Sequence, residues 1–193
     1  MSVGNVSIDR FIDELRHSMV TAELNYQIWW VYKEKNSRAR YAGTMNRYSP
    51  FFQSGIHAHF VAYLVAIYRL HEKRRDTINI PRFLDMLEKT GSLSAQTIAT
   101  GRRLLAQSKP LWIKTGILRN EAFAHRANAN GVADVFEKAA VKPDELVHLN
   151  DLTKKILNGL TSHWNKTAHV FNADSGAAAT RLLEDLRNLH AVP

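Results

Sequence analysis

The chain has 193 residues, of which 45% are hydrophobic and 23% are charged, and it contains no cysteine. This composition fits one globular domain with a sizeable core, and the lack of cysteine excludes disulfides and thiolate metal sites. Lys and Arg number 26 against 18 Asp and Glu, so the net charge is +8. The positive excess favours an anionic partner, with nucleic acid as the first candidate.

Nothing in the sequence indicates a membrane segment or a secretion signal. No apolar run reaches the roughly 18 residues that a spanning helix needs. Residues 1–10 are polar and lack the apolar segment of a signal peptide. We therefore expect a cytoplasmic protein with no membrane contact.

Helical periodicity dominates the chain, because apolar side chains recur at three- and four-residue steps. Ser7 suits an N-cap position, as do Ser92 and Ser94 for the helix that follows them; Pro50 suits a first helical turn, and Gly91 suits a helix end. In chain order, the pattern predicts helices over about 8–35, 49–73, 82–89, 95–108, 111–126, from 143 to past 169, and 177–189.

The segments between these helices are interpreted from their composition. The basic stretch 33–40 is interpreted as a solvated helix end and loop, and 78–81 as a short extended link before a proline. Lys109-Pro110 is expected to interrupt a helix, and 128–131 is typical of a turn. Residues 132–141 are ambiguous.

No repeat and no strong strand pattern accompanies these helices. The sequence therefore predicts an all-α fold, a helical bundle of about five to seven helices. We expect a single domain over 1–193, with a core at about 49–170 on which the helices 8–36 and 177–189 pack.

One segment, 117–126, reads Ile-Leu-Arg-Asn-Glu-Ala-Phe-Ala-His-Arg. It resembles the motif of the HEPN superfamily, in which an Arg, commonly followed by a polar residue such as Asn, precedes a His by four to six residues. Here five residues lie between Arg119 and His125. Upstream, the apolar stretch 60–70 and the link and helix start 78–84 resemble the abortive-infection U branch of HEPN proteins. The resemblance covers roughly 49–169.

The resemblance implies an all-helical bundle that often dimerises. Many HEPN members are metal-independent endoribonucleases of toxin–antitoxin or phage-defence systems, and others have lost catalysis and serve as binding modules. By resemblance, Arg119, Asn120 and His125 would be the active-site residues. A cognate antitoxin would be a possible partner.

These side chains suit RNA cleavage that uses the neighbouring 2′-hydroxyl as nucleophile and leaves a 2′,3′-cyclic phosphate. His125 can exchange a proton near neutral pH, Arg119 can pair with the phosphate, and Asn120 can orient either His125 or the substrate. The chemistry requires no cofactor or metal. On a regular helix, however, six residues separate the two side chains by about 120° and about 9 Å, so we expect a homodimer that brings two motifs into one cleft.

Candidate RNA contacts are Lys114 and Arg126, which are near the motif, and Arg74 and Arg75, which follow an apolar helix. For the latter two, a solvated helix end is the alternative. The motif itself also has a structural alternative, in which Arg119 pairs with Glu121 or with an acid on another helix and His125 sits near a helix end.

Two further patterns are weighed against simpler interpretations. His57 and His59 are two residues apart, which places them on opposite sides of a helix, so we predict no metal site. Trp29-Trp30 and Trp112 can stack on bases, although core or interface positions are favoured for aromatic residues at helical spacing. The leading hypothesis is a HEPN ribonuclease; the alternatives are a non-catalytic HEPN module that binds a protein or nucleotide, and a purely structural bundle.

Overall fold

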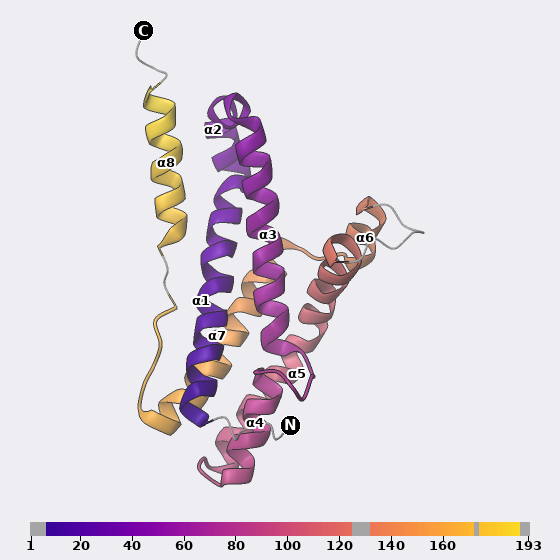
Figure 1. Ribbon diagram of the computed structural model, residues 1–193, viewed down its shortest axis with the longest axis vertical. Coiled ribbons are helices and arrows are strands. Elements are labelled where there is room, and N and C mark those ends of the chain that lie inside the picture. The colour runs from indigo at the N-terminus through magenta and orange to yellow at the C-terminus, as the bar shows by residue number, and fades with distance from the viewer. Residues whose placement is uncertain (1–6, 125–131, 172–173, 190–193) are drawn as a thin grey trace. The chain divides into compact units, whose positions relative to one another are not determined.

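The computed structural model describes residues 7–124, 132–171 and 174–189, which are helical almost throughout (Figure 1). In chain order, the elements are α1 (Ile8–Lys33), α2 (Lys35–Arg47), α3 (Ser49–His71), α4 (Ile80–Thr90), α5 (Ala95–Ile117), the π-helical segment η1 (Leu118–Ala124), α6 (Val132–Ala139), α7 (Pro143–Asn165) and α8 (Ser175–Leu189). No strand occurs among the described residues, which confirms the predicted all-α class.

The chain divides into two compact units, whose boundaries fall within α1 and α3. Unit 1 comprises Met1–Met19 and Leu64–Phe171, and unit 2 comprises Val20–Tyr63 and Asn172–Pro193. The single domain expected over 1–193 stays a prediction. None of the described helices combines the length and the apolar character that crossing a membrane requires.

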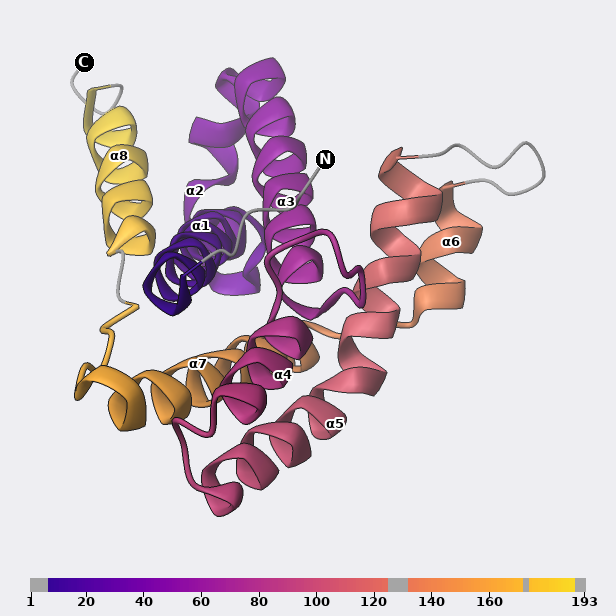
Figure 2. The same cartoon turned by 60° about the horizontal axis from the view of Figure 1, so that its bottom comes forward.

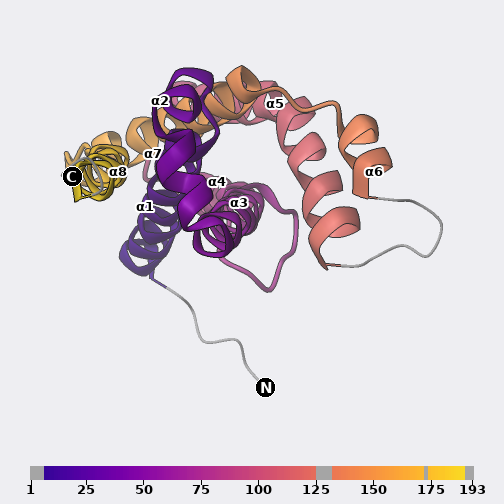
Figure 3. The same cartoon turned by 90° about the horizontal axis from the view of Figure 1, so that it is seen from above.

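In unit 1, α5 packs along α7, and α4 packs on α5 (Figure 2). Gly101 allows this close approach, because a Cβ atom at this position would lie 2.8 Å from Leu84 Cδ2 and 3.4 Å from Leu160 Cδ2. Both leucines are buried. Farther along the chain, α6 packs against η1 and α5, and Figure 3 shows α6 beside the C-terminal part of α5.

A buried histidine joins three helices of unit 1. His71 ends α3, and its Nε2 lies 2.8 Å from Thr153 Oγ1 on α7, while Nδ1 lies 3.3 Å from Ser108 Oγ on α5. Thr153 Oγ1 and Ser108 Oγ each donate their own proton to a backbone carbonyl, so either can accept from the ring, and we assign the imidazole proton to Nε2 because its contact is the shorter one. Burial lowers the pKa of His71 to about 3, and the ring is therefore neutral at physiological pH.

In unit 2, α8 contacts α2 around a small aromatic and aliphatic cluster. Tyr41 donates a 2.5 Å hydrogen bond to Glu184, which also pairs with Arg40 at 2.5 Å. At the start of α8, Ser175 Oγ donates to the Leu24 carbonyl of α1. These contacts fix α8 along the second half of α1 and along α2.

The tryptophan pair 29–30 lies in an aromatic cluster of unit 2. Trp29 is buried and stacks on Phe60 with ring centroids 4.7 Å apart, and Trp30 is parallel to Tyr26 at 6.4 Å. This is the packing role that the sequence favoured over base stacking.

The interpretation of 33–40 as a helix end and loop is wrong, because α2 begins at Lys35. Glu34 caps this helix, since its carboxylate accepts hydrogen bonds from the backbone N–H groups of Asn36 at 3.0 Å and Ser37 at 2.8 Å. These bonds lower the pKa of Glu34. The basic, polar composition of 33–40 therefore gave no sign of a helix that begins at the Glu34 cap.

The interruption expected at Lys109-Pro110 is also wrong, since α5 continues through Pro110. A proline removes one helical hydrogen bond and crowds the carbonyl four residues earlier, here that of Ala106. Ala106 and Pro110 are both exposed, so water can solvate the released carbonyl of Ala106.

Other boundaries are close to those predicted. The ambiguous stretch 132–141 contains α6, Gly91 ends α4 in the left-handed conformation, and Ser94 caps α5. The helix α7 ends at Asn165, although it was predicted to continue past 169, because Lys166 adopts a left-handed conformation with φ of 60°. The turn predicted at 128–131 lies outside the described residues.

Candidate functional site

The first residues of the predicted motif lie where α5 changes its helical period. From Leu118 to Ala124 the chain forms a π-helix, which is rare and occurs frequently at functional sites. Arg119 and Asn120 lie in this segment. The helix predicted over 111–126 is thus confirmed as far as Ala124, with a π-helical end, and His125 and Arg126 lie outside the described residues.

The Arg119 guanidinium is held by one aromatic ring and one amide. Its Nη1 donates a 2.7 Å hydrogen bond to Asn120 Oδ1, and its Cζ lies 5.1 Å from the centroid of the Tyr68 ring. Within the described part of the chain, Arg119 forms no ion pair with a carboxylate. Its orientation is therefore fixed by neutral groups, and its charge stays available to an anion.

Tyr68 of α3 is a site residue that the sequence analysis missed. Its ring contacts Trp112 edge to face, with centroids 5.8 Å apart, and the same ring lies under the Arg119 guanidinium. Gly116 makes room for it, because a Cβ atom there would lie 3.1 Å from Tyr68 Cε2. Gly116, three residues before Arg119, was the one sequence feature that could have indicated a close contact here. The sequence does not show, however, that the contacting residue is Tyr68.

Glu121 pairs with a residue other than Arg119. Its carboxylate accepts hydrogen bonds of 2.6 and 2.8 Å from Lys138 Nζ, which links η1 to α6. The described contacts therefore contain no ion pair between Arg119 and Glu121, which was the structural alternative for this segment.

Lys114, a predicted RNA contact, is already occupied by protein groups. Its Nζ donates to Glu145 Oε1 at 2.6 Å and to the Ala140 carbonyl at 3.1 Å. The ammonium group of Lys114, followed by the Lys142 backbone N–H, lowers the pKa of Glu145. This arrangement joins α5 to the start of α7 and leaves Lys114 little charge to offer an RNA phosphate.

The remaining predicted RNA contacts in the described chain follow α3. Arg74 forms a two-bond fork to Asp76, at 3.0 and 2.6 Å, so its charge is matched locally. Arg75 is exposed. The structure therefore brings Arg119 and Asn120 together, while Lys114 and Arg74 are engaged by neighbouring groups.

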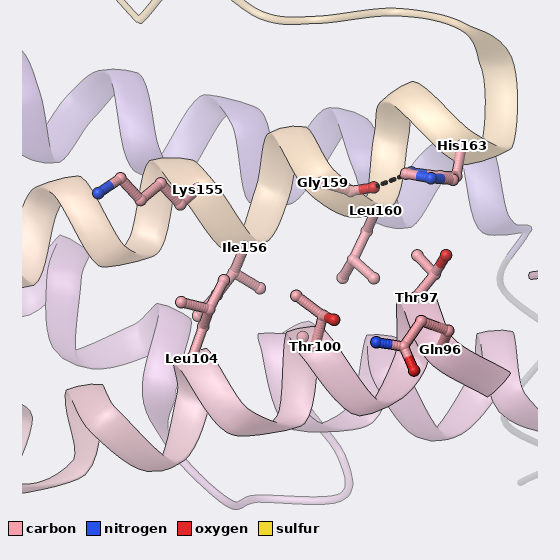
Figure 4. A pocket seen from close by; sticks show the side chains of 10 residues that line it. Gln96, Thr97, Thr100, Leu104, Lys155, Ile156, Gly159, Leu160 and His163 are labelled. Carbon is pink, nitrogen blue, oxygen red and sulfur yellow. Dashed lines mark hydrogen bonds between the residues drawn. The ribbon is translucent and has the colours of Figure 1, made fainter. Parts of the chain in front are cut away.

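A pocket of about 200 Å³ opens between α5 and α7 (Figure 4). Its rim is polar, and its floor includes Leu104, Ile156 and Leu160. His163 contributes an imidazole whose Nδ1 lies 2.7 Å from the Gly159 carbonyl. The pocket uses the first half of α5, and from Leu104 to Arg119 the helix rises by roughly 20 Å, so this pocket is separate from the motif.

The described residues contain no group of three His, Asp or Glu side chains arranged to hold a metal ion. Of the histidine pair considered in the sequence, His59 directs its Nδ1 to Asn25 Oδ1 at 2.8 Å.

An all-α fold that presents an Arg-Asn pair on a π-helical turn, with five residues between the Arg and a His in the sequence, resembles that of a HEPN-type protein. The family model described as AbiU2, a HEPN family, matches residues 6–182, and the chain belongs to this family. This membership indicates an abortive-infection or related defence module. No match is found among curated proteins or among solved structures.

Proposed function

We propose that this protein is a metal-independent endoribonuclease of a toxin–antitoxin or phage-defence system. It acts in the cytoplasm as a homodimer, and a cognate antitoxin restrains it. The catalytic residues are Arg119, Asn120 and His125. Cleavage proceeds by attack of the 2′-hydroxyl on the adjacent phosphorus, and the products carry a 2′,3′-cyclic phosphate and a 5′-hydroxyl.

The arrangement of Arg119 supports this proposal best. A half-buried guanidinium that lies on Tyr68, is oriented by Asn120 and has no carboxylate partner in the described chain is suited to a phosphate. A guanidinium presents several N–H donors in one plane, and these match two oxygens of a phosphodiester. As negative charge develops on these oxygens, the preoriented cation stabilises it.

The assignment of roles follows from the hydrogen bond to Asn120. Because Asn120 Oδ1 accepts from Arg119, its first role is to orient the guanidinium, and its amide N–H groups can donate to the substrate. His125 takes the proton of the 2′-hydroxyl or gives one to the leaving 5′-oxygen. In the homodimer, each active site combines the Arg119 of one subunit with the His125 of the other, and water exchanges the remaining proton.

The test is cleavage of varied RNAs by the purified protein in excess EDTA. We expect Arg119→Ala to lower the rate about 10²- to 10³-fold, as removal of an oxyanion donor does, and His125→Ala to lower it about 10²- to 10⁴-fold. Replacing the 2′-hydroxyl at the cut site with hydrogen should abolish cleavage, and end-group analysis should find the cyclic phosphate.

Arg103→Ala is the matched control, because Arg103 is an exposed arginine of α5 outside the motif. Its rate should equal that of the wild type. Cleavage that persists undiminished in both motif variants would refute the site. Failure of the wild type to cut any RNA would instead favour the non-catalytic binding module.

A further inference from the structure

A second pocket, of about 210 Å³, lies between the end of α3, the start of α4 and one stripe of α5. We name it the Trp112 pocket, because Trp112 lines the end nearer to the motif, and Lys73 and Lys109 line it as well. We propose that it is a nucleotide subsite for single-stranded RNA. One base stacks on Trp112, and the adjoining phosphates lie at Lys73 and Lys109. The inference rests on the proposed function, since it names how substrate is held beside Arg119.

Charge at this pocket favours an anion. Arg102, at the far end, forms ion pairs with Asp85 at 2.9 Å and with Glu88, so its charge is compensated. Lys73 and Lys109 are exposed, and neither forms an ion pair with the carboxylates that the structure describes. Two uncompensated ammonium groups therefore remain at one small opening.

The floor of the pocket is neutral. It includes His71, which is buried, hydrogen-bonded to Thr153 and Ser108, and uncharged. Leu105 contributes apolar surface beside it. A floor without charge, an aromatic wall and a cationic rim are the combination by which proteins hold single-stranded nucleic acids without reading their sequence.

The pocket is connected to the candidate catalytic residues by ring contacts. Trp112 touches Tyr68 edge to face at 5.8 Å, and Tyr68 carries the Arg119 guanidinium at 5.1 Å. Along the helix, Trp112 and Arg119 are separated by roughly 10 Å, a span of a few nucleotides in a single strand. A strand whose phosphate lies at Arg119 can thus place a neighbouring base on Trp112.

The experiment measures equilibrium binding of a fluorescein-labelled, fully 2′-O-methylated RNA oligonucleotide by anisotropy at several salt concentrations. The methylated strand lacks the nucleophile, so binding is measured without cleavage. We expect Trp112→Ala to raise Kd roughly 5- to 100-fold, the effect of losing one stacked base, and Trp112→Phe to restore most of the affinity.

The double variant Lys73→Ala/Lys109→Ala should weaken binding and also flatten its salt dependence. Loss of two phosphate contacts to a single strand lowers the slope of log K against log salt by about 1.4. Trp112→Ala should leave that slope unchanged, since stacking releases no counterions. The matched control, Lys89→Ala/Lys155→Ala, removes two exposed lysines outside the pocket and should keep the wild-type slope.

Urea unfolding curves check that each variant is folded. Equal Kd values and equal salt slopes for the pocket and control variants would overturn the subsite. A crosslink from 4-thiouridine to the peptide that contains Trp112 would support it, and crosslinks confined to other helices would count against it.

This result can be separated from the test of catalysis. If Arg119→Ala loses cleavage while the pocket variants bind normally, the ribonuclease proposal stands and the subsite fails. If the wild type cuts nothing but the pocket variants lose binding, the subsite stands as an RNA-binding site and catalysis fails.

Discussion

In the described chain, Arg119 belongs to the arginines that form no ion pair with a carboxylate. Arg40, Arg74, Arg102 and Arg187 each form an ion pair with a carboxylate. Arg82 lies over the Phe11 ring at 5.1 Å and donates to the Thr77 carbonyl, so contact with a ring can be purely structural. Arg119 combines such a contact with the Asn120 amide inside the family motif, which gives its exposed N–H groups a defined direction.

Gly116 is the residue at which this support can be tested. A methyl group in Gly116→Ala would press on Tyr68 Cε2, now 3.1 Å from the position of a Cβ, and displace the ring under Arg119. We expect the cleavage rate to fall roughly 10-fold or more, as small misplacements of a catalytic group do, with a stability loss of about 1–2 kcal/mol. Initial rates and urea unfolding provide the two measurements.

Gly43→Ala is the matched control, because a Cβ atom at position 43 of α2 meets nothing within 4 Å. It should keep the wild-type rate and gain up to about 1 kcal/mol of stability from helix propensity. Equal rates for the two variants would show that Tyr68 does not position Arg119.

The sequence predicted only part of the candidate site. Arg119 and Asn120 are found from the motif because they are adjacent in the chain. Trp112 was considered for base stacking but favoured as a core or interface residue. Tyr68 was not assigned, since its contact with Arg119, 51 positions away, depends on how α3 packs against α5. Lys114 was chosen for its closeness in sequence, but its side chain is directed to Glu145.

At the level of helices, periodicity succeeded where apolar residues are many and failed where they are few. The prediction for α3 is nearly correct because one broad apolar face runs along it. α2 was missed because only Tyr41 and Thr44 are buried along its 13 residues, and its start depends on the Glu34 cap. Pro110 was given too much weight, because the cost of a proline depends on whether water can reach the freed carbonyl.

The three-helix junction at His71 makes stability depend on pH. The folded pKa is about 3, below the usual 6.5 of the unfolded chain, so between these values the unfolded state binds a proton that the folded state does not. Stability therefore rises with pH across this window and is fully present above it. We expect His71→Gln to reduce the slope by up to about 1.4 kcal/mol per pH unit.

Urea unfolding from pH 4 to pH 8 measures this slope. His148→Gln, which replaces an exposed histidine of α7, is the control and should follow the wild type. Identical curves for the two variants would mean that His71 is not the group responsible.

At the scale of the whole molecule, the proposed homodimer can be tested by mixing two inactive variants. If each active site combines Arg119 of one subunit with His125 of the other, Arg119→Ala and His125→Ala homodimers are inactive. Mixed dimers contain one intact site. Unfolding and refolding the two variants together should then restore about a quarter of the wild-type activity. The measurement is the cleavage rate of the mixture against each variant alone.

A mixture no more active than the separate variants would place both groups of a site in one chain. Size-exclusion chromatography with light scattering, at the assay concentration, gives the oligomeric state that the mixing experiment assumes. A strictly monomeric protein would remove the composite site altogether.

The π-helical turn at Leu118–Ala124 bears on how the motif tolerates length variation. A π turn closes its hydrogen bond over one more residue than an α turn, so it absorbs an insertion without ending the helix. Deleting that residue would restore an α-helix with the downstream residues in nearly the same angular position, whereas an extra residue in a regular α-helix would rotate them by about 100°. An Arg and a His separated by different numbers of residues can therefore present the same angular relation, and motif length alone is a poor measure of active-site geometry.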